Sequence, residues 1–304
     1  MPIFAFLTGY FYAFAKKKSI GYSLKKSTDV WLTYFVFFLL LLIPAAVLGC
    51  WDASAKSFLL EAFGIHTSVM VFCWYVIFYI ISMLLLPLYH LAAKRHILPA
   101  ILLGLVLPMA VAVPVQEFVS IPAEDIKGII NDFLKWFPCI AGGYIFGKYG
   151  LFDKVFVPLF SKGIGSRILR TMICLVLMII AFMGRYYIPD IHFNISVLTI
   201  SFGMDFIYAP MFIFGLVGII YMIPRRKILL PLAVIGKYSL GMWFVHCIFF
   251  NVCKEYTQPI LFFPKNPILV LLWGIVICLA VSAAVTEALR PLLKLKNKLL
   301  FKNC

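Results

Sequence analysis

Ionisable side chains are scarce inside the long apolar stretches of this chain, and those that occur there are the first candidates for chemistry. They are Lys135, Asp205, His246, Glu287 and, near the edge of one stretch, the pair Arg185 and His192. A charged group in an apolar medium is costly, so each is expected to face an interior cavity or a partner. Imidazole is the side chain best suited to move protons near neutral pH. His246 is therefore either a candidate catalytic base or a neutral imidazole that donates a hydrogen bond between helices.

The residues before His246 predict a lined cavity. Ser239, Met242, Trp243 and His246 follow the spacing i, i+3, i+4 and i+7, so they share one face of a helix. That face is half polar on an otherwise apolar segment, which favours a cavity wall over a surface in contact with lipid. If the helix begins near Leu232, His246 lies about 21 Å along it, in the outer half of a ~30 Å hydrocarbon core.

Two groups of cations could bind phosphate, because Arg and Lys grip phosphate oxygens through charge-assisted hydrogen bonds. The candidates are Arg225, Arg226 and Lys227 in one group, and Lys16 and Lys17 in a longer lysine-rich group. The alternative interpretation is that these groups only set membrane topology.

Three further residues complete the candidate substrate-lining set with Ser239 and Trp243. Trp74 is either a packing or interfacial residue or a stacking surface for a sugar ring or an acyl chain. Arg185 and His192 lie together near the edge of a predicted span. All three are expected to act only if the fold brings them toward an interior site.

The elements that must position these residues are membrane-spanning helices. Of 304 residues, 64% are hydrophobic and 13% are charged, whereas soluble domains carry about 25% charged residues. Windows with few charges predict spans at 1–14, 30–49, 68–88, 97–115, 129–147, 168–184, 205–223, 231–250 and 267–289. Residues 193–204 are apolar but short, and we interpret them as a re-entrant or interfacial piece. Lipid offers unpaired backbone groups no partner, so the prediction is an all-α polytopic helical bundle that forms a single domain over residues 1–304.

The distribution of Lys and Arg predicts the orientation of the bundle. If the loop after the first span is cytoplasmic, 20 of the 27 Lys and Arg residues lie on the cytoplasmic side. This positive-inside bias places the C-terminus in the cytoplasm and makes the net charge of +15 mainly a matter of topology. It leaves no basis for nucleic-acid binding.

Signatures of other chemistries are missing from the sequence. Eight cysteines occur without a CxxC pair, so we expect packing roles for them and no metal site or disulfide framework. The chain contains no GxSxG, HExxH or Walker motif and no GxGxxG after a predicted strand.

Four segments, in order along the chain, resemble the family 3 membrane acyltransferases. They are MPIFAFLTGYFY (1–12), CWYVIFYIISMLLLPL (73–88), FLKWFPCIAGGYIFGKYGLF (133–152) and LAVIGKYSLGMWFVHCIFF (232–250). Each segment alone is a weak apolar match, but the ordered set extends over the whole chain. The resemblance implies a ten-span enzyme of the bacterial cytoplasmic membrane, with both ends cytoplasmic. It also implies transfer of an acyl group, usually acetyl from acetyl-CoA, to a hydroxyl of a lipid-linked or polymeric glycan, with no metal.

The chain departs from the family pattern at two places. It shows nine spans, and the segment that resembles the family's second helix begins at Met1, so we expect an N-terminally truncated or misassigned reading frame. In the family, the missing first helix carries the basic residue and the histidine to which catalysis is attributed. Asp29 and Thr33 stand where an arginine and a proline are typical.

The leading hypothesis is a membrane O-acyltransferase whose partners are membrane lipids, an acyl-CoA donor and a glycan or lipid-linked sugar acceptor. A non-catalytic relative of such an enzyme is one alternative. The other is a glycan or lipid transporter, for which Gly142–Gly143 and Pro210 would interrupt spans.

Overall fold

The structure is a computed structural model that describes residues 2–51, 54–66, 70–118, 124–154, 164–195, 198–223, 226–249 and 254–301. The chain is an all-α polytopic membrane protein, as the composition predicts. It divides into two compact units, each assembled from separated segments. Unit 1 comprises Met1–Ile20 and Leu84–Arg225, and unit 2 comprises Gly21–Met83 and Arg226–Cys304.

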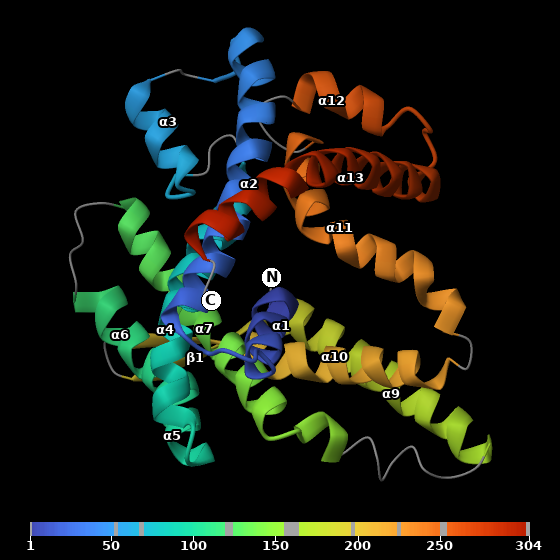
Figure 1. Ribbon diagram of the computed structural model, residues 1–304. Coiled ribbons are helices and arrows are strands. Elements are labelled where there is room, and N and C mark those ends of the chain that lie inside the picture. The colour runs from blue at the N-terminus through green and yellow to red at the C-terminus, as the bar shows by residue number, and fades with distance from the viewer. Residues whose placement is uncertain are drawn as a thin grey trace. The chain divides into compact units, whose positions relative to one another are not determined.

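Each of the nine predicted spans coincides with helical structure (Figure 1). The corresponding segments are α1 (Pro2–Ala13), α2 (Ile20–Val47), η1 (Val71–Trp74) with α4 (Tyr75–Ala93), α5 (Ile97–Ile101) with the π-helical η2 (Leu102–Val106) and α6 (Leu107–Phe118), α7 (Glu124–Lys148), α9 (Ile164–Tyr187), α10 (Asp205–Met222), α11 (Leu230–His246) with η4 (Cys247–Phe249), and α13 (Pro267–Leu300). Six of these helices are long and apolar enough to cross a membrane, whereas α1 is shorter. Three short helices were not predicted: α3 (Ala55–Ala62), η3 (Arg226–Leu229) and α12 (Lys254–Leu261).

In unit 1, α1 packs against α7 so closely that the contact requires glycine on both helices. A Cβ on Gly9 would overlap the carbonyl oxygen of Ile140, and a Cβ on Gly143 would overlap the carbonyl oxygen of Phe6. Lipid tails are as apolar as leucine side chains, so helices in a membrane associate mainly through such close van der Waals packing. The glycine pair therefore holds α1 in unit 1.

The rest of unit 1 is built around α7, α9 and α10, of which α9 and α10 lie side by side (Figure 1). The ring of Phe6 packs edge-on against Phe146 and Phe152. Phe152 in turn packs against Phe214 of α10, with ring centroids 6.1 Å apart. α9 leaves a row of large apolar side chains exposed, including Ile168 and Ile179, as expected for a helix that faces lipid.

A β-hairpin follows α9, where the sequence predicts a re-entrant or interfacial piece. β1 (Asp190–Ile195) and β2 (Leu198–Gly203) pair antiparallel, with Asp190 opposite Gly203. The segment is rich in Ile and Phe, which favour strands over helices. The sequence showed that residues 193–204 are apolar, but β-strands were not predicted there.

Glycine and proline do not break the helices of unit 1 as the transporter hypothesis requires. α7 continues through Gly142 and Gly143, and α10 continues through Pro210. That expectation was wrong, because a membrane helix can pass such residues when its neighbours satisfy the freed backbone groups.

Unit 2 has a core of aromatic rings contributed by α2 and α11. Tyr34, Phe37 and Phe38 of α2 are almost fully buried, and Phe244 of α11 packs against Tyr34 with ring centroids 5.7 Å apart. The hydroxyl of Tyr34 donates to the carbonyl of Glu61 at 2.5 Å. This bond attaches α3 to the aromatic core of unit 2.

Candidate functional site

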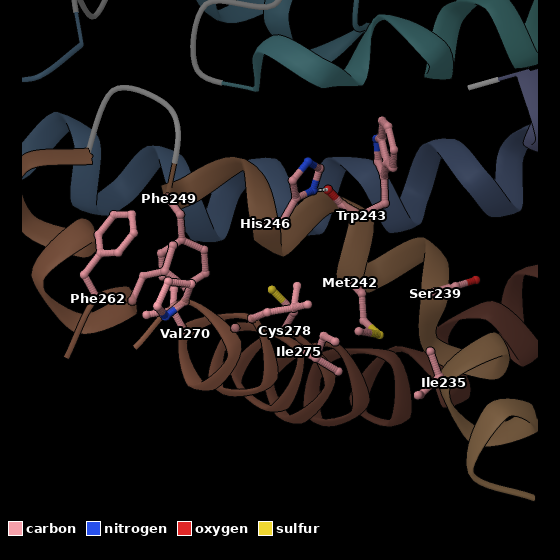
Figure 2. Close-up of a pocket in the computed structure, with 14 residues that line it drawn as sticks. Ile235, Ser239, Met242, Trp243, His246, Phe249, Phe262, Val270, Ile275 and Cys278 are labelled. Atoms are coloured by element: carbon pink, nitrogen blue, oxygen red, sulfur yellow. Dashed lines mark hydrogen bonds between the residues drawn. The ribbon is translucent and has the colours of Figure 1, made fainter. Parts of the chain in front are cut away.

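A cavity of about 590 Å³ lies among α11, α12 and α13 in unit 2 (Figure 2). Its wall includes the four residues whose spacing predicted a common face, Ser239, Met242, Trp243 and His246. The other walls are apolar and include Leu261, Val270 and Cys278. A space of this size and character suits the hydrocarbon part of a ligand.

His246 lies at the margin of this cavity with its imidazole orientation fixed. In Figure 2, Trp243 and His246 rise together from one side of α11, and their ring centroids are 5.1 Å apart. Nδ1 of His246 is hydrogen-bonded to the carbonyl oxygen of Trp243. A carbonyl can only accept, so Nδ1 carries the proton and Nε2 is the basic nitrogen of the neutral ring.

Ser239 lines the cavity, but its hydroxyl is engaged within its own helix. Its hydroxyl donates to the carbonyl of Gly236 at 2.9 Å, within its own helix. This local bond is common for serine in apolar helices and uses the hydroxyl proton. Ser239 therefore adds a polar oxygen to the wall without being arranged as a nucleophile.

The predicted intramembrane acid Glu287 joins the two helices that form the cavity. Its Oε1 accepts from Lys237 at 2.9 Å and from Tyr238 at 2.6 Å, and its Oε2 pairs with Arg290 at 2.6 Å. Ser282 of α13 donates to the carbonyl of Tyr238 at 2.7 Å. Both carboxylate oxygens are thus engaged, so Glu287 is a positioning group for α11 against α13.

A buried polar cluster lies beside the end of α11 and was not foreseen from the sequence. Glu61, Tyr34, Cys73 and Cys247 are all fully buried, and the two sulfur atoms are 3.9 Å apart. Glu61 interacts electrostatically with Tyr34 and Cys73. Glu61 lies in α3, a helix of eight residues between the predicted spans 30–49 and 68–88, where no helix was predicted.

Trp74 packs within unit 2 and does not line the cavity around His246. Its ring contacts Tyr75 and Phe78, each with a centroid separation of 6.2 Å, and its side chain is partly buried. These contacts agree with the packing interpretation of Trp74.

Arg185 belongs to unit 1, where it is held in an ion pair. Its Nε donates to Oδ1 of Asp205 at 2.6 Å, and the Asp205 side chain is 5% exposed. Lys135 lies 3.3 Å from Asp190 at the start of the hairpin. His192 lies in β1 opposite Ser201, and its side chain is outside the described part of the chain. The structure therefore groups Arg185 with Asp205 within unit 1.

The predicted phosphate-binding cations are divided between the units. Lys16 and Lys17 are exposed directly after α1 in unit 1, and Lys227 is exposed in η3 of unit 2. Arg225 and the side chain of Arg226 lie outside the described residues.

Sequence reasoning missed a second histidine that makes a side-chain hydrogen bond. His90 lies in the last turn of α4, and its Nδ1 is 2.5 Å from the hydroxyl of Tyr144 in α7. A signal was present in the sequence, because His90 follows an apolar span and precedes Lys94, Arg95 and His96.

Comparison with protein families matches residues 1–287 to the acyltransferase domain of family 3. The match covers almost the whole chain. This chain belongs to the family 3 acyltransferases. Comparison with curated proteins and with solved structures gave no match.

An acyltransferase that acts on a hydroxyl needs a base for the hydroxyl proton and donors for the developing oxyanion. In this acyltransferase, Nε2 of His246 carries the lone pair with which such a base accepts a proton. The cavity beside it is lined almost entirely by apolar side chains.

Proposed function

We propose that this acyltransferase moves an acyl group, acetyl in the simplest case, from acyl-CoA to a hydroxyl of an envelope glycan. We place it in the bacterial cytoplasmic membrane with its C-terminus in the cytoplasm, on the strength of the Lys and Arg distribution. The observation that carries the proposal is the family match over residues 1–287, combined with the orientation of His246 at the cavity.

The proposed reaction uses Nε2 of His246 as a general base. Nε2 takes the proton of the acceptor hydroxyl while the hydroxyl oxygen attacks the thioester carbonyl. The tetrahedral intermediate then collapses, the carbon–sulfur bond breaks, and the CoA thiolate takes the proton from the imidazolium. Trp243 supports this cycle, because its carbonyl holds Nδ1 and would stabilise the transient charge on the ring.

The cavity suggests which acceptor reaches this histidine. Phe249, Leu261 and Val270 give it walls that suit the lipid part of a lipid-linked sugar. The sugar hydroxyl would then lie near the polar margin formed by Trp243 and His246.

The test is a transfer assay with membranes that contain the full chain, radiolabelled acetyl-CoA and extracted envelope glycans. We expect label in the glycan as an ester that mild base removes. His246→Gln should abolish the labelling. His96→Gln, at an exposed histidine before α5, is the matched control and should leave it unchanged.

Two outcomes would contradict the proposal. Glycan movement across vesicles without label transfer would indicate a transporter. Absence of both activities, with the protein correctly inserted, would indicate a non-catalytic member of the family.

A further inference from the structure

Three helices of unit 1 end close together and carry an excess of positive charge. α1 ends at Ala13, α4 at Ala93 and α7 at Lys148. We call the side chains of Lys18, His90, Lys94 and Lys148 at these helix ends the basic end of unit 1.

The described contacts place these four side chains within mutual electrostatic reach. His90 interacts with the charges of Lys18, Lys94 and Lys148. Lys148 interacts with Lys18, and its Nζ donates to the carbonyl of Ala93 at 2.5 Å. The Nζ of Lys18 donates to the carbonyl of Ala15 at 2.9 Å. The fold therefore brings these four side chains together from three separate stretches of the sequence.

The simplest function of such lysines is to compensate the negative ends of helices. A helix C-terminus carries about −0.5 of an elementary charge, so three of them amount to roughly −1.5. The three lysines of the basic end already exceed this charge. Lys16, Lys17 and Arg95 in the same connecting segments add to the excess. Helix-end compensation thus explains part of the cluster and leaves a positive surplus.

Acidic groups do not neutralise this surplus within the described structure. Asp153 is the only acid among the described residues 14–19, 94–96 and 149–154. It is exposed and interacts with Tyr10. Among the described residues, Lys18, Lys94 and Lys148 have no carboxylate partner. An ammonium has three N–H donors, and Lys18 and Lys148 each use one on a carbonyl, so donors remain for an anion.

The imidazole of His90 can contribute a further N–H donor beside the lysine ammonium groups. The ring of Tyr144 is fully buried, and its hydroxyl lies 2.5 Å from Nδ1 of His90. When Tyr144 donates to Nδ1, the proton of the neutral imidazole is on Nε2, which then donates to an anion. Tyr149, just beyond α7, directs its hydroxyl to the carbonyl of Ala93 at 3.4 Å, and partial burial raises the pKa of this phenol. Both tyrosines thus stay protonated and hold the helix ends without adding negative charge.

We propose that the basic end of unit 1 is a binding site for a phosphate-bearing ligand. The nucleotide end of acyl-CoA, with its pyrophosphate and 3′-phosphate, has the required chemistry, and the headgroup of an anionic lipid shares it. The first source rests on the proposed function, because it names the donor of the acyl transfer. Several separate cations suit a ligand with several phosphates better than a single carboxylate.

The test uses the purified full chain in nanodiscs of phosphatidylcholine, with CoA as the probe. CoA carries no acyl group, so binding is measured without turnover. The triple variant Lys18→Gln, Lys94→Gln and Lys148→Gln should weaken CoA binding at least about tenfold. Lys94→Gln alone should weaken it about threefold, because this side chain is exposed. Raising the KCl concentration should weaken binding in the wild type more than in the triple variant.

Two controls keep a folding defect separate from a lost site. Lys294→Gln removes an exposed lysine of unit 2 and should leave CoA binding unchanged. Lys148→Arg keeps the charge and should bind CoA within about threefold of the wild type. Size-exclusion chromatography shows whether each variant is folded.

A second arm distinguishes the source of the phosphate. Nanodiscs that contain phosphatidylglycerol are analysed by native mass spectrometry for retained lipid. If the triple variant loses lipid but keeps its CoA affinity, the site binds a headgroup. Unchanged CoA affinity together with unchanged lipid retention would overturn the proposal. Transfer activity is scored separately, so a wild type that binds CoA at this site without transferring acetyl would contradict only the proposed function.

Discussion

The two units each present one histidine whose Nδ1 is engaged, and the partners give the two rings opposite chemistry. In unit 2, Nδ1 of His246 meets the backbone carbonyl of Trp243, which only accepts. In unit 1, Nδ1 of His90 meets the buried hydroxyl of Tyr144, which can donate as well as accept. In the neutral ring of His246 the basic nitrogen is therefore Nε2, whereas the neutral ring of His90 carries an Nε2–H donor when Tyr144 donates to its Nδ1.

This difference shows that the role of a histidine depends on the group that orients it as much as on its own position. A ring with a basic nitrogen beside an apolar cavity suits proton abstraction. A ring that donates, among lysines at three helix ends, suits an anion. We therefore expect His246 to affect acyl transfer and His90 to affect the binding of CoA.

The largest effect is expected at His246. His246→Ala should lower kcat about 100-fold or more, because a positioned general base contributes about 10² to 10⁴ in rate. The KM for acetyl-CoA should stay within about twofold, since the donor phosphates are bound elsewhere. Steady-state transfer kinetics in nanodiscs measure both constants. A rise in KM with unchanged kcat would erase the contrast between the histidines.

The next largest effect is expected at the glycine contact between α1 and α7, because α7 is the helix that carries Tyr144. Gly143→Ala should destabilise the protein by about 1–3 kcal/mol, because the new methyl group overlaps the carbonyl of Phe6 and forces α1 away from α7. Gly142→Ala is the matched control, since a Cβ there meets no atom within 4 Å. Thermal unfolding in detergent, followed by size-exclusion chromatography, compares the two variants. Equal stability would show that α1 is not held by the glycine contact.

The smallest effect is expected at Tyr144. Tyr144→Phe removes the group that orients His90 and should weaken CoA binding about threefold to tenfold, the value of one hydrogen bond of about 1 kcal/mol. The kcat should not change, because the reacting atoms do not touch this residue in the proposed reaction. Binding of CoA and transfer kinetics measured on the same preparation separate the two readouts. A loss of kcat instead would move Tyr144 and His90 into the catalytic machinery.

Much of the fold was predictable because a membrane makes helix formation depend on local hydrophobicity. Each of the nine predicted spans coincides with helical structure, since lipid gives backbone groups no other partner. The hairpin at Asp190–Gly203 escaped prediction because strand pairing depends on a second segment of the chain. The shared cavity wall of Ser239 and His246 was predictable from spacing alone.

The basic end of unit 1 was not predictable in the same way. It combines α1, α4 and α7, and no local pattern in the sequence reports that Tyr144 meets His90. Conversely, the ion pair of Arg185 with Asp205 joins residues 20 positions apart, and only the fold shows that Arg185 is already engaged. Interactions between distant segments are thus the part of the site that a single sequence conceals.

The glycine contact between α1 and α7 also bears on how the protein is made. α1 has 12 residues and is about 18 Å long, too short to cross a ~30 Å hydrocarbon core by itself. Synthesis at about 5–20 residues per second separates Gly9 from Gly143 by on the order of 10 s. The close contact between Gly9 and Gly143 can therefore form only after α7 has been synthesised, so the packing of α1 in unit 1 depends on a segment made well after it.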